Sequence, residues 1–97
     1  IRDACKRLGT TDLSECELYT TCEPCLLCVS AIYWAKIRKM YYAYTQEECE
    51  RIGFSTKGLV DEVTRPLASR KLPSQRVCAK EADLLFQEWA ASPYFKP

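Results

Sequence analysis

The stretch from Cys16 to Tyr44 constrains the fold most strongly, because it alternates strand, helix and strand patterns with little chain between them. Residues 16–21 are rich in types that favour a pleated strand, and residues 37–44 are rich in tyrosine and lack Gly and Pro. Between them, Pro24 fits the first turn of a helix that we predict to run from Pro24 to Lys36. Because the connections are short, we expect two parallel strands joined by a crossover helix.

Helical patterns lie on both sides of this unit. Residues 1–8 place apolar side chains at helical spacing, and Gly9 follows as a stop signal. Thr45 is a good N-cap for a short acidic helix over residues 46–52. The alternation of strands and helices predicts a layered α/β fold.

The C-terminal half is harder to interpret. Residues 54–80 predict a long, partly irregular connection, in which Leu59, Val60 and Val63 are candidate strand residues. After it, apolar side chains recur at helical spacing over residues 82–90 and predict an amphipathic helix. No linker divides the chain, so we expect residues 1–97 to form a single unit.

Composition narrows the range of functions that the chain can be expected to have. Fourteen basic and thirteen acidic residues leave a net charge of +1, which does not favour a nucleic-acid partner. The longest apolar stretches reach about half of the roughly 20 residues that a membrane span requires, so we predict no membrane span. Seven cysteines without a disulfide framework favour a reducing location such as the cytoplasm. The absence of histidine is unusual, because histidine is the commonest zinc ligand.

Cys25 and Cys28 stand three positions apart at the start of the predicted central helix. Side chains at this spacing share one helix face, and both sulfurs can reach one zinc ion at about 2.3 Å. Free N–H groups and the helix dipole favour thiolates there, and the thiolate is the form that binds metal. A Cys-x-x-Cys pair is also typical of redox sites and structural zinc knuckles, so its spacing alone leaves these alternatives open.

The wider segment from Leu18 to Ile37 resembles the cytidine deaminase-like zinc hydrolases, specifically their guanine deaminase and tRNA adenosine deaminase branch. The resemblance rests on the Glu-Pro-Cys-x-x-Cys sequence between a strand and a helix. It implies a three-layer α/β/α fold with a mixed sheet, and zinc held by Cys25 and Cys28. The implied activity is zinc-dependent hydrolytic deamination of a purine base, guanine or a related aminated heterocycle.

The same resemblance identifies what these 97 residues lack. In the family, the third zinc ligand is a His, and a Glu two residues later moves the proton. Both lie on the helix that precedes the Cys-x-x-Cys strand, and residues 1–8 resemble the continuation of that helix. We therefore expect the His and Glu upstream of Ile1, in a nucleobase deaminase domain of which residues 1–97 form the C-terminal portion. We expect no catalytic residue in this chain, which alone should be inactive.

The resemblance also suggests substrate contacts and a partner. Glu23 is a candidate for positioning substrate, although its place at the helix entry equally suits a cap. Related guanine deaminases exchange C-terminal segments between subunits, which implies a homodimer with Tyr94 near a substrate. Cys22 is expected to face away from the zinc site. Ser55 stands where that branch usually has an acidic residue, which leaves the identity of the base open.

Two alternatives remain at this stage. A tRNA adenosine deaminase would need a strongly basic face, which the near-neutral charge does not favour. A non-catalytic structural module would instead hold zinc in a closed site made of Cys25, Cys28 and two further cysteines.

Overall fold

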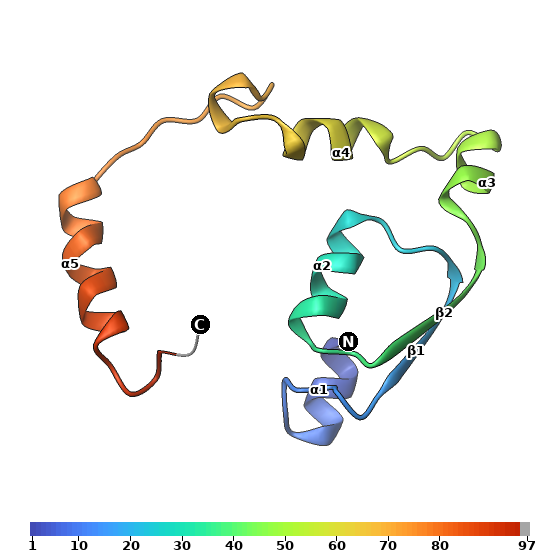
Figure 1. Ribbon diagram of the computed structural model, residues 1–97, viewed down its shortest axis with the longest axis horizontal. Helices are drawn as coiled ribbons and strands as arrows, with labels where there is room; N and C mark the ends of the chain where they lie inside the picture. Colours follow the sequence, from blue (N-terminus) through green and yellow to red (C-terminus); the bar gives the residue numbers. More distant parts are fainter. Residues whose placement is uncertain (96–97) are drawn as a thin grey trace. The chain divides into compact units, whose positions relative to one another are not determined.

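A computed structural model describes residues 1–95, and the chain divides into one part from Ile1 to Arg65 and a second from Pro66 onward (Figure 1). The two parts are described separately. The first contains α1 (Arg2–Leu8), β1 (Glu17–Cys22), α2 (Leu26–Trp34), β2 (Lys39–Tyr44), α3 (Gln46–Arg51) and α4 (Lys57–Thr64). The second contains a 3-10 turn, η1 (Leu67–Ser69), and α5 (Ala79–Ala90).

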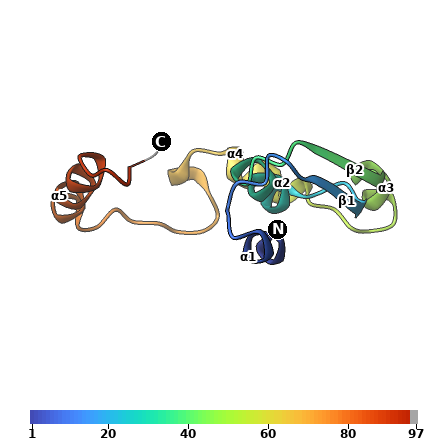
Figure 2. The same cartoon turned by 90° about the horizontal axis from the view of Figure 1, so that it is seen from below.

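The predicted strand–helix–strand unit is confirmed. β1 and β2 pair in parallel, with Glu17 opposite Lys39 and Cys22 opposite Tyr44. In both views α2 lies beside the two strands that it connects (Figures 1 and 2). Exposed and half-buried residues alternate along β1, so every second side chain faces α2. Both strands end at the same edge of the sheet, where the loops that follow them meet.

The helix α2 is shorter than the predicted Pro24–Lys36. It begins at Leu26, because Cys25 has an extended backbone and is the N-cap. It ends at Trp34, because Lys36 adopts a left-handed conformation with φ 61°. The Lys36 N–H donates to Tyr33 O and the next N–H donates to Ile32 O, which together form a Schellman turn. This turn sends the chain directly back into β2.

A small core lies beneath the C-terminal end of α2. Leu13, in the loop before β1, is 2 % exposed and is buried with Ile32 and Ala35. The backbone N–H of Leu13 also donates to Ala35 O at 2.8 Å. The loop before β1 thus carries the most deeply buried side chain among residues 1–95.

The helix α3 begins with the cap that the sequence predicts. The Thr45 hydroxyl accepts from Glu48 N–H at 3.1 Å, and the Glu48 carboxylate accepts from Thr45 N–H at 3.1 Å. This reciprocal capping box satisfies donors that the first turn of a helix leaves without partners. Gly53 follows the helix with φ 99°, a conformation that favours glycine.

Thr45→Ala should lower the free energy of unfolding by about 1 kcal/mol, because it removes the side-chain half of this cap. Urea unfolding followed by far-UV circular dichroism measures the change. Thr56→Ala is the matched control, since Thr56 is the N-cap of α4 but makes no capping hydrogen bond with its side chain. Equal losses in the two variants would show that the capping box contributes nothing.

The helix α4 corrects the prediction for residues 54–80. Leu59, Val60 and Val63 were candidate strand residues, yet all three lie in α4, Lys57–Thr64. Leu59 is one position from Val60 and four positions from Val63, so the three side chains lie on one side of a helix. Valine favours strands because of its branched Cβ, and that preference misled the sequence argument where no partner strand is available.

The second part confirms the predicted C-terminal helix, which forms over Ala79–Ala90 as α5. Near its end, the Trp89 ring meets Phe86 and Phe95 edge to face, with centroids 5.8 and 4.9 Å apart. No helix within residues 1–95 is long and apolar enough to cross a membrane.

These elements confirm the α/β class. Over residues 1–95 the sheet has only the parallel pair, so the mixed sheet and the third layer stay predictions. The single-unit organisation of residues 1–97 stays a prediction too.

Candidate active site

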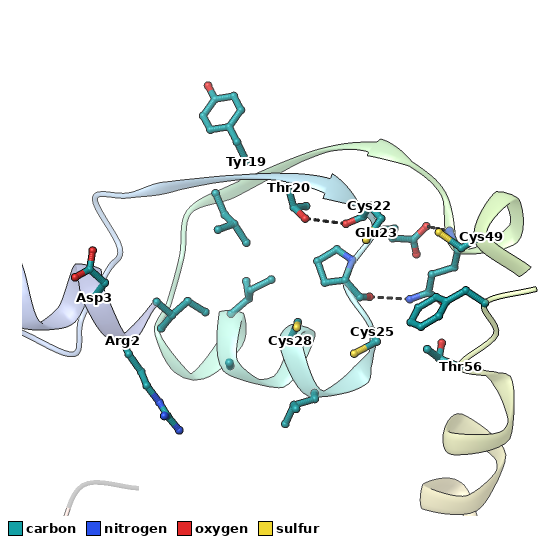
Figure 3. A pocket seen from close by; sticks show the side chains of 18 residues that line it. Arg2, Asp3, Tyr19, Thr20, Cys22, Glu23, Cys25, Cys28, Cys49 and Thr56 are labelled. Atoms are coloured by element: carbon teal, nitrogen blue, oxygen red, sulfur yellow. Dashed lines mark hydrogen bonds between the residues drawn. The ribbon is translucent and has the colours of Figure 1, made fainter. Parts of the chain in front are cut away.

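A cleft of about 730 Å³ opens in the first part of the chain, at the carboxyl ends of β1 and β2 (Figure 3). Clefts outside the carboxyl ends of parallel strands are the usual ligand sites of α/β proteins. The lining comes from residues 1–3, from β1, from the loop and helix between Glu23 and Ile32, and from the chain between Gln46 and Thr56. Cys25 and Cys28 both line this cleft, as does Glu23.

The two cysteines of the Cys-x-x-Cys sequence occupy defined positions at the start of α2. Cys25 is the N-cap and Cys28 is the third helical residue, with their sulfurs on the cleft side of the helix (Figure 3). These are the positions that a capping residue and its N–H partner take in other helices. Cys25 is half-buried and Cys28 is exposed, and both thiols are free. Both cysteines line the cleft, although Cys25 precedes the helix, and their role as zinc ligands stays a prediction.

The backbone around the helix start changes the acidity of both thiols. The N–H groups of Cys28 and then Leu27 lower the pKa of the Cys25 thiol, although neither completes a geometrically regular capping bond. The negative charge on Cys25 and then burial raise the pKa of the Cys28 thiol. The thiolate is therefore favoured at Cys25, and its negative charge opposes a second thiolate at Cys28. A cation bound between the two sulfurs would offset the repulsion between their two negative charges.

Cys22 does not face away from this site, contrary to the sequence prediction. It is the last residue of β1, on the half-buried side of the strand, and it lines the cleft together with Cys49 of α3. Burial and then the charge of Cys22 raise the pKa of the Cys49 thiol. Within residues 1–95, however, no three His, Cys, Asp or Glu side chains are placed to hold one metal ion.

Glu23 is a cap, but for a helix other than the one expected. Its carboxylate accepts from the backbone N–H of Gln46 at 3.2 Å, at the start of α3. Its side chain also lines the cleft, so substrate contact by Glu23 stays a prediction. Tyr94 is 83 % exposed and belongs to the second part of the chain, and its role near a substrate stays a prediction as well.

Two further segments contribute to the cleft without having been predicted from the sequence. Gln46 lines it and reaches the loop before α2, and residues 1–3 line it from the start of α1. The β2 pattern that ends at Tyr44 could have indicated Gln46, because loops after neighbouring parallel strands meet at one edge. No local signal marks residues 1–3, which reach the cleft through the packing of α1.

Comparison with known proteins agrees with this geometry. Residues 1–44 match the family model for the cytidine and deoxycytidylate deaminase zinc-binding region. Guanine deaminase from Bacillus subtilis is 39 % identical over 89 residues, which are 92 % of this chain and 57 % of that protein. A tRNA-specific adenosine deaminase from Agrobacterium fabrum is 50 % identical over 42 residues, which are 43 % of this chain and 28 % of that protein.

Comparison with solved structures also finds a guanine deaminase. The crystal structure of Bacillus subtilis guanine deaminase superposes with a TM-score of 0.84 and 34 % identity, covering 100 % of this chain and 62 % of that one. The chain thus spans less than two thirds of the length of these relatives. The two thiols, the cleft and the family match agree, and residues 1–44 carry the cytidine and deoxycytidylate deaminase zinc-binding region.

Proposed function

We propose that the protein containing this chain catalyses zinc-dependent hydrolytic deamination of a purine base, guanine or a related aminated heterocycle. The extent of similarity carries this proposal. Similarity to the guanine deaminase covers 92 % of the chain, whereas similarity to the tRNA-specific enzyme from Agrobacterium covers 43 % of it. The guanine deaminase match therefore continues well beyond the zinc-binding region, as expected of a shared pocket and not only of a shared metal site.

The residues present fit two positions of a zinc site. Cys25 and Cys28 are soft sulfur donors at the spacing that one zinc ion needs, and the lowered pKa of Cys25 favours the binding form. Bound zinc would supply Lewis-acid activation of water at neutral pH. We propose that the third protein ligand, a His, and the proton-transferring Glu come from residues that precede Ile1. The first residues of α1 line the same cleft, which supports this placement.

The chain's own residues would hold and enclose the reactants. Cys25 and Cys28 would anchor the metal at the positive end of α2, where N–H dipoles favour their negative charge. Leu27 and Phe54 contribute apolar surface to the cleft, which suits a flat heterocycle and keeps bulk water away from it. Glu23 would accept a hydrogen bond from an amino or ring N–H group of the base. Ser55 follows Phe54 in place of an acid, so the base bound need not be guanine.

We further propose a homodimer in the cytoplasm, in which exchanged C-terminal segments bring Tyr94 to the partner's cleft. The apolar residues Leu84, Leu85 and Phe86 of α5 are more than half exposed, and such a surface suits an interface between subunits. All seven cysteines are free, which suits a reducing compartment.

Ammonia release from guanine, adenine, cytosine and a tRNA substrate tests the activity. We expect a form extended upstream of Ile1 to bind zinc and to release ammonia from a purine base, and residues 1–97 alone to release none. Zinc bound without ammonia release from any substrate would contradict the proposal. Release from tRNA alone would assign the protein to the other branch, and release by residues 1–97 would show that the proton-transferring group lies within them.

A further inference from the structure

The loop that carries Cys25 is held by the chain that follows β2. Tyr44 O accepts from the backbone N–H of Glu23 at 2.7 Å, which extends the β1–β2 ladder by one bond. The side-chain amide of Gln46 donates to Pro24 O at 2.7 Å, and the backbone N–H of Gln46 donates to the Glu23 carboxylate at 3.2 Å. Gln46 thus bonds to both residues that precede Cys25.

The Pro24 carbonyl has particular need of such a donor. The first helical hydrogen bond of α2 goes to Cys25 O, which accepts from Val29 N–H at 2.9 Å. The Pro24 carbonyl therefore accepts no hydrogen bond from the helix, and Pro24 is a buried residue. A buried carbonyl without a donor is costly, and Gln46 supplies the donor.

This bond also fixes the direction of the Cys25 side chain. The Pro24 carbonyl belongs to the peptide plane that immediately precedes the Cys25 Cα. Holding that plane, together with the extended ψ of 175° at Cys25, sets where the Cys25 sulfur lies relative to Cys28. Groups that orient a metal ligand without touching the metal commonly contribute 10–100-fold in affinity.

We infer that Gln46 is a positioning residue for the zinc site, acting through the Pro24 carbonyl on the Cys25 thiolate. The inference rests on the proposed function, because it takes Cys25 and Cys28 to be zinc ligands. The helix α3 would then contribute to metal binding through a residue that lies outside the Cys-x-x-Cys sequence.

Titration with Co²⁺, a spectroscopic substitute for Zn²⁺, tests the inference through the sulfur-to-cobalt absorption band. Gln46→Met keeps the length of the side chain and removes the donor, and we expect affinity to fall by about 10–100-fold. Gln46→Glu also removes the donor but adds a negative charge that suits the start of α3. It should weaken binding as well, although a charge effect alone would strengthen attraction for a cation.

Gln87→Met is the matched control, because Gln87 is exposed on α5, in the second part of the chain, and its side-chain amide donates to Asp83 at 2.9 Å. Urea unfolding of each variant shows whether the first part remains folded. Affinities of both Gln46 variants equal to the control would overturn the inference and leave the zinc site intact. Absence of the sulfur-to-cobalt band in the unsubstituted protein would overturn the zinc site, and the inference with it.

Discussion

Cys28→Ala is expected to abolish measurable zinc binding by residues 1–97. The proposed site takes two zinc ligands from this chain, Cys25 and Cys28, so the variant keeps only Cys25 of that pair. The loss should exceed the roughly 10–100-fold effect of changing a residue that merely orients a ligand. Competition for Zn²⁺ with a chromophoric chelator measures the affinity. Because Cys28 is exposed, its replacement should leave the far-UV circular dichroism spectrum unchanged.

Cys78→Ala provides the matched comparison, since Cys78 is also a free, exposed cysteine but lies next to α5. It should bind zinc as the unsubstituted chain does. Equal affinity in the two variants would show that Cys28 is not a ligand and would remove the basis of the proposed metal site.

Leu13→Ala should have the largest effect on stability, lowering the free energy of unfolding of the first part by about 2–5 kcal/mol. Leu13 is 2 % exposed, and it packs with Ile32 and Ala35 in a core that contains few other fully buried apolar side chains. The cavity would undermine the C-terminal end of α2, which fixes the turn into β2. The urea midpoint, followed by far-UV circular dichroism, measures the loss.

Leu8→Ala is the control for this change, because Leu8 is 60 % exposed on α1 and alanine is a good helix former. Its midpoint should stay close to that of the unsubstituted protein. Similar midpoints for the Leu8 and Leu13 variants would mean that the described core does not stabilise the first part.

The sequence predicted those elements whose ends carry strong local signals. Gly9 with φ 66° ends α1, and the capping box of Thr45 begins α3, as expected. The ends of α2 were placed less well, because Lys36 adopts a left-handed conformation that only the Schellman turn into β2 explains. The strand predicted around Val63 was wrong because valine's local preference for strands was taken as decisive. The structure has the helix α4 at these residues.

For the candidate site, the pair of cysteines was predictable and its surroundings were not. Cys25 and Cys28 are three positions apart at the start of α2, so the local course of the chain brings them to the same cleft. The contributions of Cys22 and Gln46 depend on how β1 alternates and on which residue follows β2. Such contacts join segments about twenty positions apart, and periodicity within one segment carries no information about them.

Because β1 and β2 are parallel, mutations at the two ends of the strands should have different effects. At one end, the loops after Cys22 and Tyr44 meet at the cleft, and changes there alter what is bound. At the other end, Leu13 and the turn at Lys36 support the helix without reaching that cleft. Variants that adapt the protein to a new heterocycle should therefore be sought in the loops after the strands, while the opposite end remains a fixed scaffold.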